Sequence, residues 1–305
     1  MSTAPLPATL EHARPRAPID LMTWPWFSLA KTKRATPIYH QSRHHSLLVA
    51  PVPGAGAIAT IWDADILFWA TAQLIQAQDE RLHTTATLIA PARRILRFLQ
   101  RETGRSQYAR LAAALDRLAA TEVATTLGAA DGSPATFRWI EAWRTTPDGI
   151  VVAVPVWLLN AIRRRRVLAI TPGYFALTGG IERWLWLFAR AHAAQLPTGW
   201  WVSLDQLRDR SGSAARHSDF IAALRVLSRS GVLLAYRIEP VWHRGQEGVR
   251  FSRSPAVIHS AAMVPGDKPG FDPQLRSASV SERSLSHAPH RRMDANPPPF
   301  TGWSC

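Results

Sequence analysis

The sequence predicts a mainly α-helical protein with short β-hairpins, an α+β class in which two winged-helix domains follow each other in tandem. Two observations lead to this prediction. Three helix-like segments followed by β-branched segments occur once in each half of the chain, and the chain is strongly basic, with 36 Lys and Arg against 22 Asp and Glu and a net charge of +14. A winged helix has three helices and a β-hairpin, and its third helix enters the major groove of DNA.

The first group of helices begins near residue 63. The segment WDADILFWATAQLIQAQ places apolar side chains on one helical face, and Asp63 stands in a good N-cap position. PARRILRFLQRE follows, with Pro91 suited to a first helical turn. In the third helix, QYARLAAALDRLAATEVATTL, apolar residues three or four positions apart line one face before β-branched residues take over: Tyr108, Leu111, Leu115 and Leu118.

Two strands are expected after the third helix. ATFRWIEAW (135–143) and GIVVAVPVW (149–157) are rich in β-branched and aromatic residues and flank the turn PDG. They would form the hairpin of the first winged helix.

The second half has the same order of elements. GGIERWLWLFARAH predicts a helix, VSLDQLRDRSG a short helix closed by Gly212, and residues 211–231 a third helix that leads into the strand VLLAYRI. The two third helices superpose at a constant offset of 109 residues, which matches Ala114, Leu115, Leu118 and Val123 with Ala223, Leu224, Leu227 and Val232. Two similar units in tandem are the simplest interpretation.

The predicted domain boundaries follow from this order. Residues 1–23 and 255–305 are rich in Pro, Ala and Ser with little periodicity, and we expect both to be disordered. Residues 24–160 form the first winged-helix domain, and residues 161–254 form the second, which binds DNA.

The composition also excludes some classes of protein. Cys305 is the only cysteine, so neither an intrachain disulfide nor a zinc site built from cysteines is possible. The longest apolar run, IVVAVPVWLL at 150–159, is too short to span a membrane, and the N-terminus has no signal-peptide pattern. We expect a soluble, cytoplasmic protein with no cofactor, no metal and no catalytic residue.

The high pI of about 11.3 indicates a polyanionic partner, and double-stranded DNA is the commonest one. On a helical wheel of the last helix, Phe220, Ile221, Leu224 and Leu227 face the core, and Ser218, Ala222, Arg225 and Arg229 form the opposite stripe. Small residues there let a helix approach a groove closely, and arginines can bond phosphates or guanine edges. The candidate DNA-binding residues around this helix are Arg208, Arg210, Ser213, Arg216, Ser218, Arg225 and Arg229.

The first unit offers a similar stripe. Residues 91–120 contain seven arginines against two acids, a local balance of +5. The candidate DNA-binding residues of this unit are Arg101, Arg105, Ser106, Arg110 and Arg117. The alternative is that these arginines cover the solvated surface of an ordinary helix.

Other patterns leave two interpretations open or are weaker. The run RRRR at 163–166 either grips DNA or keeps a turn solvated. Asp63 and Asp65 could form a metal carboxylate pair, but capping and the favourable helix N-terminus explain both.

Five segments, in order, resemble the replication initiator protein A family of bacterial plasmids: WFSLAKTKRATPI, ATIWDADILFWA, YARLAAALDRLAATEVATT, FRWIEAW and YFALTGGIERWLW. The similarity covers residues 26–240. It implies a protein with two winged-helix domains that binds origin sites, helps to open AT-rich DNA and recruits host helicase or initiator proteins. It also implies that the helix around residues 213–229 reads the major groove and that the helix around 106–117 contacts the second part of the site. A homodimer that represses its own gene is a further possibility by analogy.

Two rival functions stay open at this point. A winged-helix transcription regulator would have the same helices. A rolling-circle nicking endonuclease would need a metal-binding histidine pair and a nucleophilic tyrosine, but His44 and His45 are adjacent rather than separated. The four tyrosines lack such partners nearby in the sequence.

Overall fold

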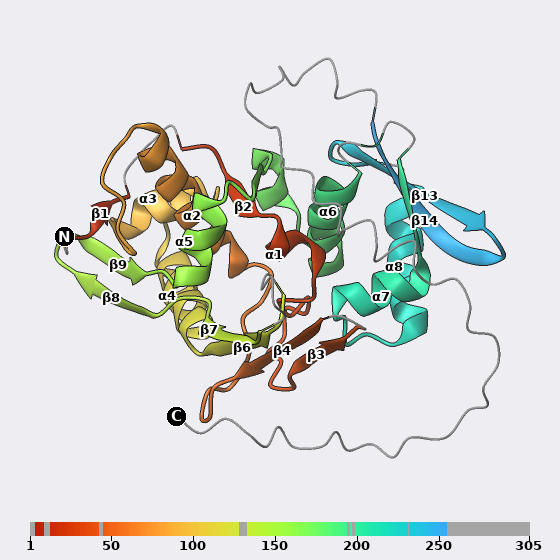
Figure 1. Cartoon of the computed structure of the whole chain (residues 1–305), viewed down its shortest axis with the longest axis horizontal. Helices are drawn as coiled ribbons and strands as arrows, with labels where there is room; N and C mark the ends of the chain where they lie inside the picture. Colours follow the sequence, from red (N-terminus) through yellow and green to blue (C-terminus); the bar gives the residue numbers. More distant parts are fainter. Residues whose placement is uncertain are drawn as a thin grey trace. The chain divides into compact units, whose positions relative to one another are not determined.

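The computed structural model describes residues 4–8, 13–42, 45–127, 133–193, 196, 199–230 and 232–254 (Figure 1). These residues form a mixed α and β structure with eight α-helices, one short 3₁₀ helix (Pro172–Ala176) and four sheets. Strands are more extensive than the predicted short hairpins. The predicted disordered tail, 255–305, lies outside the described residues.

The first half contains a helix-rich unit built on a four-stranded sheet. Its elements, in chain order, are α2 (Ala64–Asp79), β5 (Thr87–Ala90), α3 (Ala92–Phe98), α4 (Arg105–Ala119), β8 (Ala142–Thr146) and β9 (Gly149–Ala153). The sheet order is β1-β5-β9-β8, in which β1 (Leu6–Pro7) runs parallel to β5 and the other pairs are antiparallel. A Cβ at Gly149 would lie 2.4 Å from the Ala90 carbonyl oxygen, so this close turn requires glycine.

A second sheet lies in the same half of the chain. Its order is β3-β4-β6-β7, all antiparallel, with β3 (Ile38–Gln41), β4 (Ser46–Pro51), β6 (Thr121–Thr125) and β7 (Ala135–Arg138). The predicted strand 135–143 is therefore divided between two sheets. Trp139 and Ile140 are buried at the division, and Trp139 packs edge-on against Trp26 and Trp157.

The predicted strand 149–157 is also shorter than expected. β9 ends at Ala153, and helix α5 (Val156–Arg163) begins after Pro155. Proline fixes its own φ near the helical value, and the lost N–H costs nothing at a helix start. The strand β10 (Val167–Ala169) then follows and pairs antiparallel with β2 (Arg16–Pro18).

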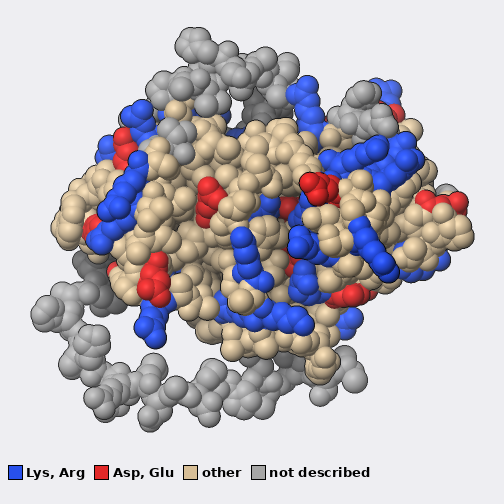
Figure 2. All heavy atoms as spheres, turned by 180° about the vertical axis from the view of Figure 1, so that it is seen from behind, with Lys and Arg blue, Asp and Glu red and all other residues tan. Residues whose placement is uncertain are grey.

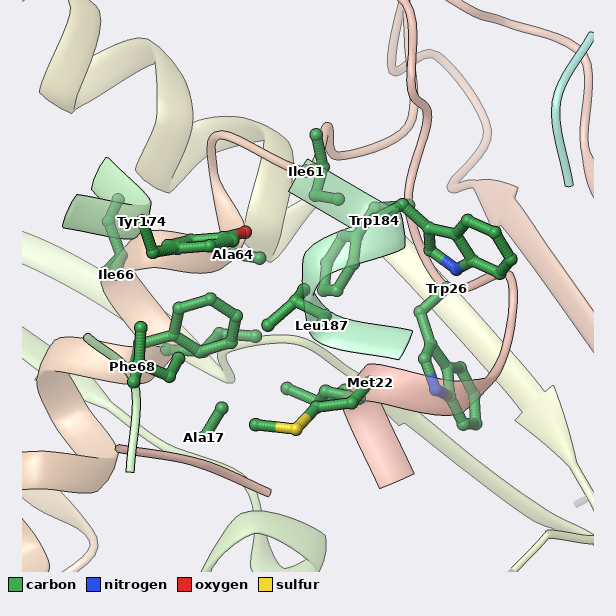
Figure 3. Packing of buried hydrophobic residues seen from close by; sticks show 14 of the residues in the cluster. Ala17, Met22, Trp26, Ile61, Ala64, Ile66, Phe68, Tyr174, Trp184 and Leu187 are labelled. Carbon is green, nitrogen blue, oxygen red and sulfur yellow. The ribbon is translucent and has the colours of Figure 1, made fainter. Parts of the chain in front are cut away.

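The N-terminal region differs from the prediction of disorder over 1–23. Its described residues include β1, β2 and helix α1 (Asp20–Thr23), and Ala17, Leu21 and Met22 are buried. Figure 3 shows Ala17 and Met22 in the same cluster of side chains as Phe68 and Leu187. The Ala- and Pro-rich composition suggested a free chain, but small and apolar side chains here fill the core and repay the cost of ordering them.

The second half has a similar order of elements to the first: helix, strand, two helices and then strands. Its elements are α6 (Gly180–His192), β11 (Trp200–Ser203), α7 (Leu204–Ser211), α8 (His217–Arg229), β12 (Val232–Leu233), β13 (Tyr236–His243) and β14 (Gln246–Arg253). The sheet order is β11-β14-β13-β12, all antiparallel. In each half, the strand after the first helix pairs with the last strand of a hairpin, as β5 does with β9 and β11 with β14. The helices predicted in both halves are confirmed.

Candidate nucleic-acid interface

Helix α8 has the two faces that the sequence predicted. Phe220, Ile221 and Leu224 are buried, and Leu227 packs against the core. The opposite face is exposed and carries Ser218, Ala222, Arg225 and Arg229, with Arg216 exposed just before the helix. In Figure 1, α8 lies beside α7 and the hairpin β13–β14. The exposed stripe is therefore a surface that a large partner can reach.

Several local contacts fix the conformation of the turn between α7 and α8. Ser203 caps α7 by accepting a hydrogen bond from the Gln206 N–H, and Gly212 ends the helix in the left-handed region at φ 60°. A Cβ at Gly212 would lie 2.6 Å from Pro25, so the turn also packs too closely for a side chain. Ser213 accepts from the Ala215 N–H and Arg208 donates to the Ala215 carbonyl. These two predicted DNA-binding residues are thus bonded within the turn.

Arg210 is also engaged inside the protein. Its guanidinium carbon lies 3.9 Å from the centre of the Trp24 ring, a cation–π contact. Burial lowers the pKa of Arg210, and the neighbouring Asp209 opposes this shift. Arg210 therefore supports the position of α7 against the first half of the chain.

Two further contacts connect the α7–α8 region to the N-terminal half. Arg34 donates one hydrogen bond to the Gly212 carbonyl at 2.7 Å and two more to the carbonyls of Thr36 and Pro37. The buried His40 of β3 lies 3.2 Å from an Asp209 carboxylate oxygen, and this contact lowers the pKa of Asp209. Neither contact was predictable from local sequence, because the partners lie about 170 to 180 residues apart.

The hairpin β13–β14 extends the exposed surface next to α8. Glu247 accepts from Arg225 at 3.5 Å, and an open groove of about 310 Å³ is lined by Arg225, Ser228 and Arg229 of the helix and by Pro240 of the hairpin. Trp242 is 72% exposed near the hairpin turn and was not among the predicted DNA-binding residues. The sequence signal for it is an aromatic residue just before Arg244 and Gly245. These two residues form the turn, and both have positive φ.

The candidate DNA-binding residues of the first unit fall into two groups, exposed residues and residues in ion pairs. Arg105, Ser106 and Arg110 are exposed on α4. Arg117 instead makes a two-pronged ion pair with Asp63, at 2.7 and 2.8 Å, and Arg101 pairs with Asp65 at 2.9 Å. The structure thus brings Arg105, Ser106 and Arg110 together at the surface, while Arg101 and Arg117 hold buried carboxylates.

Asp63 and Asp65 have a different role from the expected one. Asp63 precedes α2, but its side chain does not cap the helix; it accepts from Thr60 and Arg117. Asp65 is fully buried and accepts two hydrogen bonds from the buried Arg183 of α6, at 2.8 and 3.0 Å. The capping interpretation is wrong, because the carboxylates serve as partners for arginines far along the chain.

Hydrogen bonds and a ring contact hold the guanidinium of the buried Arg183. It donates to the carbonyls of Leu177 and Phe175 and lies 4.9 Å from the Tyr174 ring centre. Burial raises the pKa of the Asp65 carboxyl, whereas the Arg183 and Arg101 guanidinium groups lower it. This buried cluster joins the segments IWDAD and LTGGIERWL, one from each half of the chain.

Charge is distributed over several parts of the surface. On the face drawn in Figure 2, Lys and Arg side chains predominate over Asp and Glu. In the run at 163–166, Arg165 pairs with Asp79 and Arg166 with Asp20, so half of this run is neutralised. Among the described residues, no group of three His, Cys, Asp or Glu side chains is placed to hold a metal ion, and no helix is long and apolar enough to cross a membrane.

Comparison with solved structures defines the class of fold. The chain superposes with a TM-score of 0.54 on the crystal structure of domains 2 and 3 of RctB, covering 78% of this chain and 98% of that one at 12% sequence identity. At this identity the likeness concerns the fold alone.

Comparison with protein families then identifies the chain. The model of the replication initiator protein A family matches residues 16–238, and the chain belongs to this family. A relative from Wigglesworthia glossinidia brevipalpis, named "Putative replication protein", is 26% identical over 236 residues, which are 73% of this chain and 84% of the relative. The resemblance stated from the sequence is confirmed.

Proposed function

We propose that this protein initiates replication by binding double-stranded origin DNA through two winged-helix units, α2–β9 and α6–β14. The observation that carries the proposal is the exposed stripe of α8, with Arg216, Arg225 and Arg229 around the small residues Ser218 and Ala222. The major groove is about 12 Å wide and admits a helix of about 10–12 Å diameter. In this proposal α8 enters the groove, and the hairpin β13–β14 contacts the backbone.

The first unit would contact a second part of the site through α4. Arg105, Ser106 and Arg110 are exposed there and can bond phosphates, whereas Arg101 and Arg117 are held by buried carboxylates. We therefore assign the outer three residues to DNA and the inner two to support of the helix. Binding through two helices would lengthen the site and raise its specificity.

Later steps follow from family membership. Occupied sites would promote opening of neighbouring AT-rich DNA and recruit host helicase or initiator proteins, and a homodimer would repress the protein's own gene. We place the protein with its DNA in the bacterial cytoplasm. The proposal assigns no catalytic step, so incubation with supercoiled plasmid and magnesium or manganese should leave the plasmid uncut.

The test is a footprint of the purified protein on the DNA that flanks its own gene, at about 150 mM salt, where specific and non-specific binding are well separated. Protection of repeated sites beside an AT-rich tract would support an initiator. Protection confined to a promoter would indicate a regulator instead. Absence of any protected site would refute the proposal.

A further inference from the structure

An apolar residue lies on the exposed face of α8, at the edge of the stripe formed by Ser218, Ala222, Arg225 and Arg229. Val226 is 63% exposed, while three other large apolar residues of the helix, Phe220, Ile221 and Leu224, are buried. At about 100° per residue, Val226 lies about 40° around the helix from Ala222, one turn earlier, and about 60° from Arg229, almost one turn later. Valine is a poorer helix former than alanine, lysine or arginine, so neither helix stability nor solubility accounts for it.

The major groove offers one apolar group to such a side chain. Of the four bases, only thymine carries a C5-methyl group there; the other edges present hydrogen-bond donors and acceptors. The surroundings of Val226 suit DNA, because Arg225 precedes it and Arg229 follows on the exposed surface. Asp219, the acid of the same face, lies seven residues earlier, about 10 Å along the helix.

We propose that Val226 packs against the C5-methyl group of one thymine in each bound site and makes the protein specific for a T·A pair at that position. This inference rests on the proposed function, since it needs α8 in the major groove. Ala222 adds no bulk beside Val226, so the methyl groups can approach to van der Waals distance. Burial of one methyl-sized group supplies about a four-fold gain in affinity.

The experiment replaces, one at a time, each thymine of a footprinted site by deoxyuridine, which removes only the methyl group. At one position we expect deoxyuridine to weaken binding of the wild-type protein about four-fold. Val226→Ala should bind the thymine site as weakly as the wild type binds the deoxyuridine site, and should not distinguish the two. Because alanine favours the helix, a loss of affinity in this variant does not come from unfolding of α8.

Val156→Ala is the matched control, since Val156 is 66% exposed on α5 and should leave both affinities unchanged. The inference is overturned if no thymine distinguishes the wild type from Val226→Ala, or if both proteins lose equal affinity on every deoxyuridine site. Absence of any footprint would overturn the proposed function itself, and the inference with it. The two failures are therefore distinguishable.

Discussion

Individual arginines of the interface differ in what they can contact. Arg216 and Arg225 lie at the surface of the α8 region, and Arg225 makes a long contact, 3.5 Å, with Glu247. If either side chain meets a base, its change to Ala should weaken specific binding by about 1–3 kcal/mol and leave binding to unrelated DNA almost unchanged. Titration of both DNAs with each variant measures this. Equal weakening on both would identify a phosphate contact.

Asp65 is the residue on which the buried cluster depends. Changing Asp65 to Asn removes its charge and leaves the buried Arg183 guanidinium uncompensated, which should lower the free energy of unfolding by about 3–5 kcal/mol. Urea denaturation measures the change. The control is Asp79→Asn, whose exposed pair with Arg165 should contribute about 1 kcal/mol or less. Similar losses in both variants would contradict the role of Asp65.

His192 should make the free energy of unfolding fall in acid. It is stacked on Trp200 at 4.2 Å between ring centres, and burial, with a smaller effect of Arg210, lowers its pKa to about 3. The unfolded chain takes up this proton near pH 6.5, so the contribution of His192 is intact above pH 6.5 and is lost at about 1.4 kcal/mol per pH unit as the pH falls towards 3. His192→Phe should flatten the dependence of unfolding free energy on pH in this window. An unchanged slope would show that the folded and unfolded chains protonate His192 over the same pH range.

Whether a site residue could be predicted from the sequence depends on how far its partner lies along the chain. Arg110 and Arg117 are seven residues apart on one helix, and both appear on its outer stripe in the sequence. Only the fold brings Asp63 to Arg117, across 54 positions, and so removes it from the surface. The exposed and buried faces of α8 were predictable, because both follow from the local spacing of apolar residues. The paired arginines were not, because their partners are distant in sequence.

At the scale of elements, the α7–α8 turn depends on the loop that carries Arg34. Arg34→Ala removes the hydrogen bond to the Gly212 carbonyl, and we expect specific DNA affinity to fall about three- to ten-fold because the recognition helix is less well held. Arg34→Lys should not restore it, since the planar fork of donors is lost. Affinity and its salt dependence are the measurements.

Lys33→Ala is the matched control, because Lys33 is exposed beside Arg34 and carries the same charge. If Arg34 acts by position, Lys33→Ala binds like the wild type and the salt dependence of Arg34→Ala is unchanged. Equal losses in the two variants, with a reduced salt dependence in both, would mean that the loop touches phosphate instead.

Elements were predictable to different degrees. Helices α2, α4, α6 and α8 carry a local pattern of apolar residues, and all were predicted. Strands β3 and β4 and the pair β2–β10 were not, since short strands are stabilised by partners elsewhere in the chain. The start of helix α5 falls in the predicted strand 149–157, because apolar runs of this length fit both structures.

At the scale of the molecule, the two basic helices predict a steep response to salt. Five exposed arginines lie on the proposed DNA surfaces: Arg105, Arg110, Arg216, Arg225 and Arg229. If all neutralise phosphates, the slope of log affinity against log salt is about −4.5, and the double variant Arg105→Ala/Arg110→Ala should reduce its magnitude by about 2. Binding measured between 50 and about 200 mM salt gives both slopes. A slope unchanged in the double variant would mean that α4 does not touch the DNA.

Strands β2 and β10 pair with each other, but the ribosome synthesises them at widely separated times. Pro18 pairs with Val167, so β2 leaves the ribosome long before its partner strand exists. At about 5–20 residues per second the interval is roughly 7–30 s. Throughout it, Ala17, Leu21 and Met22, which end in the core, have no finished core to enter and are open to association with other chains. β2 is therefore synthesised well before β10 and packed late.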